Sequence, residues 1–290
     1  MRFALFPPTS SPSLRTCSER DNMLRLYATV AAGGFRRHAT YRVATLAGLF
    51  TNTVFGFVLS YTYLALWAER PDLGGYSSSD ALAYVWIGQA LLTVCGLMGG
   101  GFEDELIERI RTGDIAVDLH RPVDLQSWWC AANAGRCAYQ LAGRGAVPLL
   151  IGALAFRFTL PDGPAGWAAF LFAVALGSFV SFALWYLVAM SAFWLLDGQG
   201  VVQAAWLTGL FFSGMLLPLN VFPGALGELA HALPWAALLQ VPADVYLGRY
   251  GEGWGLVRAY GFQLGWLAVL LAAGRAAQSA ATRKVVVQGG

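Results

Sequence analysis

Lysine is almost absent from this chain of 290 residues, where Lys284 is the single one. A phosphate-binding loop of the G-x-x-x-x-G-K-[ST] type needs a lysine inside it. Lys284 is followed by Val285, and no such glycine pattern precedes it. The sequence therefore excludes this nucleotide site, and we expect the chain to bind no cofactor of its own.

Charge of either sign is also scarce. Only 12% of the residues are charged, against roughly 25% in ordinary soluble domains, while 57% are hydrophobic and the mean hydropathy is +0.54. A soluble protein this apolar could not cover its surface with polar groups. The net charge of +2 is too small to indicate nucleic-acid binding. The composition predicts an all-α integral membrane protein.

Cysteine and histidine are few and scattered. The cysteines stand at positions 17, 95, 130 and 137, and they form no C-x-x-C pair and no cluster with histidine. A metal or redox site is not expected from such spacing. We interpret Cys130 and Cys137 as small apolar fillers on one helix face.

Long uncharged runs are what the chain has in abundance. Runs of this kind are long enough to cross the ~30 Å hydrocarbon core of a bilayer. Together with two apolar runs that carry arginine, the third and the sixth below, they predict six transmembrane helices, at about 43–67, 81–101, 141–158, 167–195, 201–217 and 255–274.

Two arginines complicate the third predicted span. Arg136 and Arg144 interrupt the apolar stretch 128–158, and an arginine at mid-membrane costs about 2.5–3.5 kcal/mol on insertion scales. We therefore start the span at position 141, so that Arg144 reaches the interface with its long side chain. The alternative is that Arg144 faces a substrate path.

The two ends of the chain are more polar than its apolar central region. Residues 1–22 lack periodicity, which predicts a disordered tail or a true start at Met23; residues 23–42 suit an interfacial helix, and 275–290 form a basic tail. Six spans would place both ends on one side of the membrane. Fifteen of the nineteen basic residues fall on that side, so both termini and the loop 102–126 are expected in the cytoplasm.

The loop 102–126 is the most polar stretch of the chain, with seven acidic residues and three arginines. Its first half predicts a helix with acids near the N-terminus and arginines near the C-terminus, which suits the helix dipole. Gly113 would end this helix, and Arg121-Pro122 would continue as an extended link. An apolar stripe favours docking on a partner over a solvated loop; its residues are Phe102, Leu106, Ile107 and Ile110.

Prolines interrupt the apolar region 218–245. Because proline breaks a straight helix, we predict one or two short re-entrant helices there, and such backbone at membrane depth must be buried in protein or line a cavity. His231 lies in this segment, where a polar cap is favoured over a proton or ligand role.

Several segments carry a resemblance to a known family. They are RRHATYRVATLAGLFTNTVFGF (36–57), YVWIGQALL (84–92), RIRTGDIAVDLHRPVDLQ (109–126), FSGMLLPLNVFPGALGELAHALPWAALLQVPADVYLG (212–248) and the terminal VVVQGG. On these segments the chain resembles the permease subunits of type-2 ATP-binding-cassette exporters, from about residue 25 to its end.

The resemblance implies a dimer of permeases, identical or homologous, with two ATPase subunits that hold ATP and Mg²⁺, in the bacterial inner membrane and in contact with lipid. A hydrophobic or amphipathic cargo, such as a lipid, drug or antibiotic, would be exported. It assigns ATPase coupling to Phe102, Glu105, Leu106, Glu108, Arg109, Ile110, Arg111 and Asp114. It assigns loop fixing to Asp118, Arg121, Pro122 and Asp124, and a re-entrant gate to Pro218, Pro223, His231, Pro234 and Pro242.

Two other classes of function remain as alternatives. An intramembrane enzyme could use Asp118, His120 and Asp124 for acid–base chemistry, although their spacing meets no catalytic signature. An ion-driven secondary transporter would need charged residues near the membrane midplane, and the first, second, fourth and fifth predicted spans have none.

Overall fold

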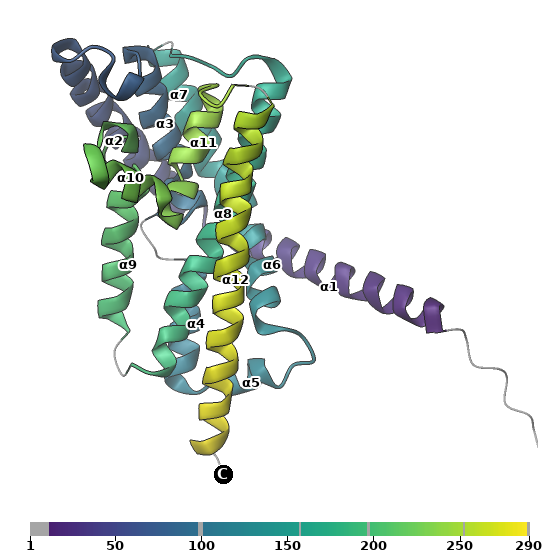
Figure 1. Cartoon of the computed structure of the whole chain (residues 1–290). Coiled ribbons are helices and arrows are strands. Elements are labelled where there is room, and N and C mark those ends of the chain that lie inside the picture. Colours follow the sequence, from purple (N-terminus) through teal and green to yellow (C-terminus); the bar gives the residue numbers. More distant parts are fainter. Residues whose placement is uncertain (1–11, 98–100, 157, 196–197, 252, 289–290) are drawn as a thin grey trace, which may run out of the picture.

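The long helix α8 (Gly163–Met190) runs through the centre of the fold, and the long helix α12 (Trp254–Gln288) packs along it (Figure 1). The computed structural model describes residues 12–97, 101–156, 158–195, 198–251 and 253–288, and every element in these ranges is helical. In the most apolar 18-residue stretch of α8, 61% of the residues are buried, whereas 17% are buried in the corresponding stretch of α12. The central position of α8 explains why its sequence is apolar on all sides.

Four helical runs in the described part of the chain are long and apolar enough to cross a membrane. They are α2 (Arg42–Glu69), the run Leu125–Phe156, α8 with the following η3 turn (Ser191–Phe193), and α12 as far as Arg283. These runs correspond to the first, third, fourth and sixth predicted spans.

The second and fifth predicted spans correspond to shorter helices. α3 (Ser78–Val94) has 17 residues and α9 (Gln199–Phe212) has 14. A full crossing takes about 20 residues at 1.5 Å each. Length and composition therefore support four crossings, and a count of six depends on α3 and α9.

Several helices are longer than their charge-free runs. α1 (Pro12–Thr40) begins inside the tail 1–22, of which residues 1–11 lie outside the described part. The third run joins α6 (Leu125–Gln140), the π-turn η2 (Leu141–Gly145) and α7 (Ala146–Phe156), and α12 continues through most of the predicted tail. Charged residues are unfavourable inside the bilayer, but most of them are good helix formers. The helices can therefore extend beyond the apolar runs.

The proline-rich segment forms four short helices between α9 and α12. They are η4 (Leu219–Val221), α10 (Gly224–Ala232), η5 (Pro234–Ala237) and α11 (Gln240–Tyr246). Pro218, Pro223 and Pro234 lie at or before helix starts, where the missing N–H leaves no helical bond unmade. Together with η1 (Leu73–Gly75) they lie toward the upper end of the molecule in Figure 1.

The N-terminal helix α1 packs along α6 through small residues (Figure 1). A Cβ atom added to Gly34 would overlap the carbonyl oxygen of Ala132, and one added to Gly135 would overlap the carbonyl oxygen of Ala31. The two backbones therefore approach each other closely, as glycine pairs allow in membrane helices.

Replacing Gly34 with leucine is expected to separate α1 from α6 and lower the free energy of unfolding by about 1–3 kcal/mol, the usual cost of overpacking. Gly33 is the matched control, because a Cβ atom there would meet no atom within 4 Å. Thermal unfolding of the purified variants measures the difference. Equal melting temperatures for Gly34→Leu and Gly33→Leu would contradict the close packing.

Candidate functional site: the α4–α5 unit

The polar loop folds into two short helices toward the lower end of the molecule, α4 (Phe102–Thr112), which packs against α8, and α5 (Ile115–Leu119) (Figure 1). Three acids occupy the first turn of α4, and Arg109 and Arg111 occupy its last turn, in line with the helix dipole. Gly113 caps the helix with a φ of 86°, which glycine adopts without strain.

The apolar stripe of α4 is covered by the chain itself. Leu106 is fully buried and Phe102 nearly so, within a core that includes Phe182 and Met190 of α8. The ring centroids of Phe102 and Phe182 lie 4.8 Å apart. The stripe was expected to face a partner, and this expectation is corrected: the stripe attaches α4 to α8. Ile107 and Ile110 pack at the edge of the same core.

A chain of ion pairs connects α1, α4, α5 and the link that follows. Arg37 contacts Glu105 at 2.7 Å, and Glu105 contacts Arg109 at 3.2 Å. Arg109 contacts Asp118 at 3.1 Å, and Asp118 contacts Arg121 at 3.2 Å. Asp118 is only 4% exposed, so it holds two arginines from the buried side. This arrangement fixes α4 relative to α5 and to α1.

Burial and charge act in opposite directions on the acids of α4. Partial burial would raise the pKa of Glu105, but the hydrogen bonds and charges of Arg37 and Arg109 outweigh it and lower that pKa. Burial raises the pKa of Glu103, whose carboxylate accepts a 2.8 Å hydrogen bond from the backbone N–H of Gly101. The carboxylate of Glu103 therefore stabilises the N-terminal end of α4, and the carboxylate of Glu105 joins α4 to α1.

The link between α5 and α6 is held at both ends. The guanidinium of Arg121 lies over the ring of Trp128, 5.1 Å from its centroid. The carboxylate of Asp124 caps α6 by accepting a 2.8 Å hydrogen bond from the backbone N–H of Ser127. Pro122 is exposed between these two points. These two contacts hold the link between α5 and α6 in place, and the link in turn positions α4 and α5.

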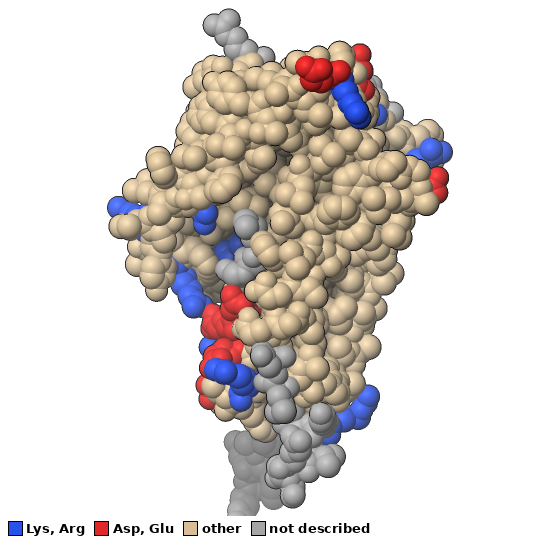
Figure 2. Space-filling model, turned by 90° about the vertical axis from the view of Figure 1, so that its left-hand side faces the viewer, with Lys and Arg blue, Asp and Glu red and all other residues tan. Residues whose placement is uncertain are grey.

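The opposite face of the unit is exposed and charged. Figure 2 shows acidic and basic side chains mixed in the lower part of the view, with a second group of charges at its upper end. Glu108 and Arg111 form an exposed pair at 2.9 Å. Val117 of α5 is an exposed apolar residue, with 62% of its surface accessible. The other exposed residues of this face are Asp104, Thr112, Gly113 and Asp114.

The residues that an intramembrane enzyme would need are not assembled. The carboxylate of Asp118 forms ion pairs with Arg109 and Arg121, and the carboxylate of Asp124 accepts hydrogen bonds from Ser127. His120 is exposed at the end of α5. The one hydroxyl that the described part of the chain brings to them is that of Ser127, which donates a 2.7 Å hydrogen bond to Asp124 at the start of α6.

The proline-rich segment 218–245 is held by a buried polar network that the sequence did not indicate. Gln240, fully buried, accepts hydrogen bonds from the hydroxyl of Tyr84 at 2.9 Å and from the backbone N–H of Leu219 at 2.8 Å. Its amide donates to the hydroxyl of Tyr76 and to the carboxylate of Asp244, each at 2.8 Å. The network joins η1, α3, η4 and α11.

Asp244 is the one carboxylate of this network. The hydroxyl of Tyr76 donates to it at 2.6 Å, and Arg249 contacts it at 3.5 Å while lying over the ring of Tyr76. Burial raises the pKa of Asp244, and the hydrogen bonds and the charge of Arg249 offset only part of this rise. The only sequence signal was a single acid in an apolar run, which could have marked a buried and paired carboxylate.

The predicted gate residues lie around this network without forming one site. Pro218, Pro234 and Pro242 are buried, whereas Pro223 is exposed. His231 is exposed near the C-terminal end of α10. The prolines shape the helix starts, and the contacts that hold the segment come from other side chains.

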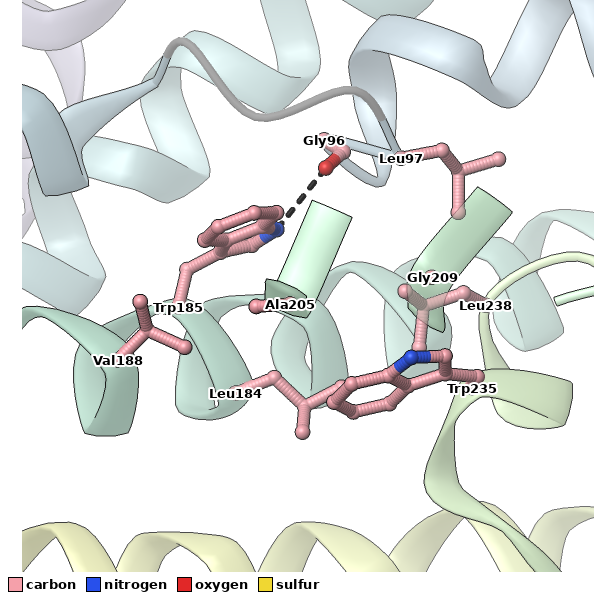
Figure 3. Close-up of a pocket in the computed structure, with 9 residues that line it drawn as sticks. All are labelled: Gly96, Leu97, Leu184, Trp185, Val188, Ala205, Gly209, Trp235 and Leu238. Atoms are coloured by element: carbon pink, nitrogen blue, oxygen red, sulfur yellow. Dashed lines mark hydrogen bonds between the residues drawn. The ribbon is translucent and has the colours of Figure 1, made fainter. Parts of the chain in front are cut away.

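A small apolar hollow lies between α8, α9 and η5 near the end of α3 (Figure 3). Leu184, Val188 and Leu238 line it, and Trp185 donates a 2.9 Å hydrogen bond to the carbonyl of Gly96. The indole N–H of Trp235 is buried without a hydrogen-bond partner in the described part. The free space is about 10 Å³, room for about one water, so this hollow is closed to a larger ligand.

These features define a class, the multi-pass α-helical membrane proteins with a polar helical unit at one end of the bundle. Residues 50–289 match the family described as ABC-2 family transporter protein, and the chain belongs to this family. No curated protein matches the chain at a significant level. Membership of the family implies partnership with ATP-binding subunits.

Proposed function

We propose that the chain is the permease subunit of an ATP-driven exporter, without an ATPase site of its own. The observation that carries this proposal is the α4–α5 unit, whose apolar side is attached to α8 and whose charged side is exposed. A separate subunit binding the charged side would act directly on the central helix of the bundle.

In the proposed topology the chain crosses the membrane six times, with both termini and the α4–α5 unit in the cytoplasm of a bacterial cell. The distribution of basic residues supports this orientation. α3 serves as the second crossing inside the bundle, where twelve of its residues are buried. α9 is completed by the short helices of the segment 218–245.

The proposed mechanism is rigid-body transmission. Two ATPase subunits, which hold ATP and Mg²⁺, close and press on the α4–α5 units of two permease subunits, identical or homologous. Because Phe102 and Leu106 are embedded against α8 and Asp118 fixes α5, the unit moves with the bundle. The ordering of these contacts before any partner binds reduces the entropy lost on docking.

The cargo is proposed to be hydrophobic or amphipathic, such as a lipid, a drug or an antibiotic-like compound. Exposed apolar side chains on the outer face of α2 suit lipid or a second permease subunit; they include Val43, Leu46 and Phe50. Cargo would leave beneath the segment 218–245.

Charge reversal on the exposed face tests the proposal. The double variant Asp104→Arg and Glu108→Arg is expected to keep its thermal stability and to lose most of its binding to the co-expressed ATPase, because like charges across an interface cost several kcal/mol. Co-purification and ATP hydrolysis of the complex measure the loss. Glu228→Arg, an exposed reversal on α10, is the matched control.

Leu106→Asp tests the buried face of α4 separately from its exposed face. An aspartate at this fully buried position is expected to destabilise the chain itself, so its ATPase binding falls together with its melting temperature. Full ATPase binding by the charge-reversed variant would contradict docking through the exposed face. If neither the wild type nor any variant binds an ATPase, the permease proposal fails as a whole.

A further inference from the structure

Arg144 lies in a membrane-crossing run without a recorded partner. It belongs to η2, the π-turn between α6 and α7. Its Nε atom is buried and lacks a hydrogen-bond partner in the described part of the chain. The ion pairs recorded there involve other arginines. A cation in this position needs an anion or water, because its solvation by lipid tails is poor.

The position of the guanidinium is set by a glycine on the neighbouring helix. A Cβ atom added to Gly48 of α2 would overlap the guanidinium of Arg144, so the planar group lies directly against the α2 backbone. Gly48 follows Arg42, the first residue of α2, by six positions, which is about 9 Å along the helix. This depth is close to the head groups of the leaflet next to Arg42.

The π-turn and its surroundings shape the site around this cation. Such turns insert one extra residue into a helix and often occur at functional sites. A Cβ atom added to Gly143, next to Arg144, would lie 3.6 Å from the methyl group of Thr45, so η2 is in van der Waals reach of α2. The hydroxyls of Thr45 and Tyr139 are 3.0 Å apart at the same contact. This hydroxyl pair joins α2 to α6 beside Gly143, one residue from the position of Arg144 in the chain.

An acceptor without a donor lies one turn before the cation. The side-chain oxygen of Gln140 is buried and has no hydrogen-bond partner in the ranges that the structure describes. A cation and an unpaired acceptor on successive turns match a ligand that combines a phosphate with a hydroxyl or ammonium group. Phospholipid head groups carry this combination, and the long side chain of an arginine at this depth can reach them.

We propose that Arg144 binds the phosphate of an anionic phospholipid from the leaflet next to Arg42, at the contact between α2 and η2. Arginine presents a fork of N–H donors that matches phosphate geometry. The side chain is half-buried, so its outer part is open to lipid while its Nε lies inside. The site does not depend on the ATPase partner or on the cargo.

Lipid binding by the purified full-length chain tests the site. Native mass spectrometry with phosphatidylglycerol is expected to show that Arg144→Gln weakens binding about tenfold, the loss expected for one charge-assisted hydrogen bond. Gly48→Ala is expected to weaken it as well, because the new methyl group displaces a guanidinium that is still present. Arg36→Gln, which removes an exposed arginine of α1, should leave this binding site unchanged.

Three comparisons decide the outcome. Stronger retention of phosphatidylglycerol than of diacylglycerol by the wild type, with this preference lost in Arg144→Gln, supports a phosphate site. Competition by inorganic phosphate at low concentration would overturn the lipid assignment in favour of a free anion. Equal phosphatidylglycerol binding by the wild type, Arg144→Gln and Gly48→Ala would overturn the site, provided that their melting temperatures agree.

Discussion

Asp118→Ala is expected to lower the free energy of unfolding by about 2–3 kcal/mol and to reduce coupled ATP hydrolysis by the complex severely. Asp118 is 4% exposed and contacts Arg109 at 3.1 Å and Arg121 at 3.2 Å. Removal of one member of a fully buried ion pair costs about 3–5 kcal/mol, and the arginines here are partly exposed, which reduces the cost. Without Asp118, α5 and the link lose their common anchor.

Asp162→Ala is the matched control for this substitution, because Asp162 is exposed at the start of α8, outside the α4–α5 unit, and its side chain makes no capping hydrogen bond. Thermal unfolding and ATP hydrolysis by the reconstituted complex measure the two effects. If Asp118→Ala loses ATP hydrolysis but still co-purifies fully with the ATPase, the result supports the role of Asp118 as the anchor of α5 and of the link to α6. Unchanged hydrolysis in Asp118→Ala would show that the ion-pair chain is dispensable for coupling.

Gln240→Leu is expected to have the largest effect on stability, about 3–5 kcal/mol. The amide of Gln240 joins four partners, and its loss leaves the hydroxyl of Tyr84 and the backbone N–H of Leu219 buried without their acceptor. Each buried polar group left unpaired costs about 1–3 kcal/mol. The segment 218–245 would then separate from η1 and α3.

Gln203→Leu is the matched control, since Gln203 is exposed on α9. Thermal unfolding in detergent measures the difference in stability, and limited proteolysis reports whether the segment 218–245 becomes accessible. A melting temperature of Gln240→Leu equal to that of Gln203→Leu would contradict a structural role of the network. The proposed exit for cargo would then need another anchor.

Much of α4 could be predicted from local sequence, but its orientation could not. The spacing of Phe102 and Leu106, the acids of the first turn and the glycine at position 113 all specify a helix with one apolar face. The same pattern suits a face that binds a partner and a face that packs on the chain's own α8. Only the tertiary contacts of Phe182 and Met190 distinguish these possibilities.

The lengths of the crossings show a second limit. A charge-free run measures how much of a helix lipid tolerates, so it located the apolar cores of α2, α8 and α12 well. It could not show that α6 continues through η2 into α7, since a π-turn with Arg144 still satisfies its backbone hydrogen bonds. The short helices α3 and α9 left the number of crossings undecided for the same reason.

The sequence by itself determined that this is an α-helical membrane protein without a lysine-containing phosphate loop, because composition and the length of uncharged runs are properties of the chain alone. It also determined the place of the polar α4–α5 unit and the ends of α4. The tertiary structure decided which face of α4 stays exposed and which side chains hold the segment 218–245. Tyr76 and Asp244 meet across 168 positions, and no local pattern specifies a contact that depends on how distant helices pack.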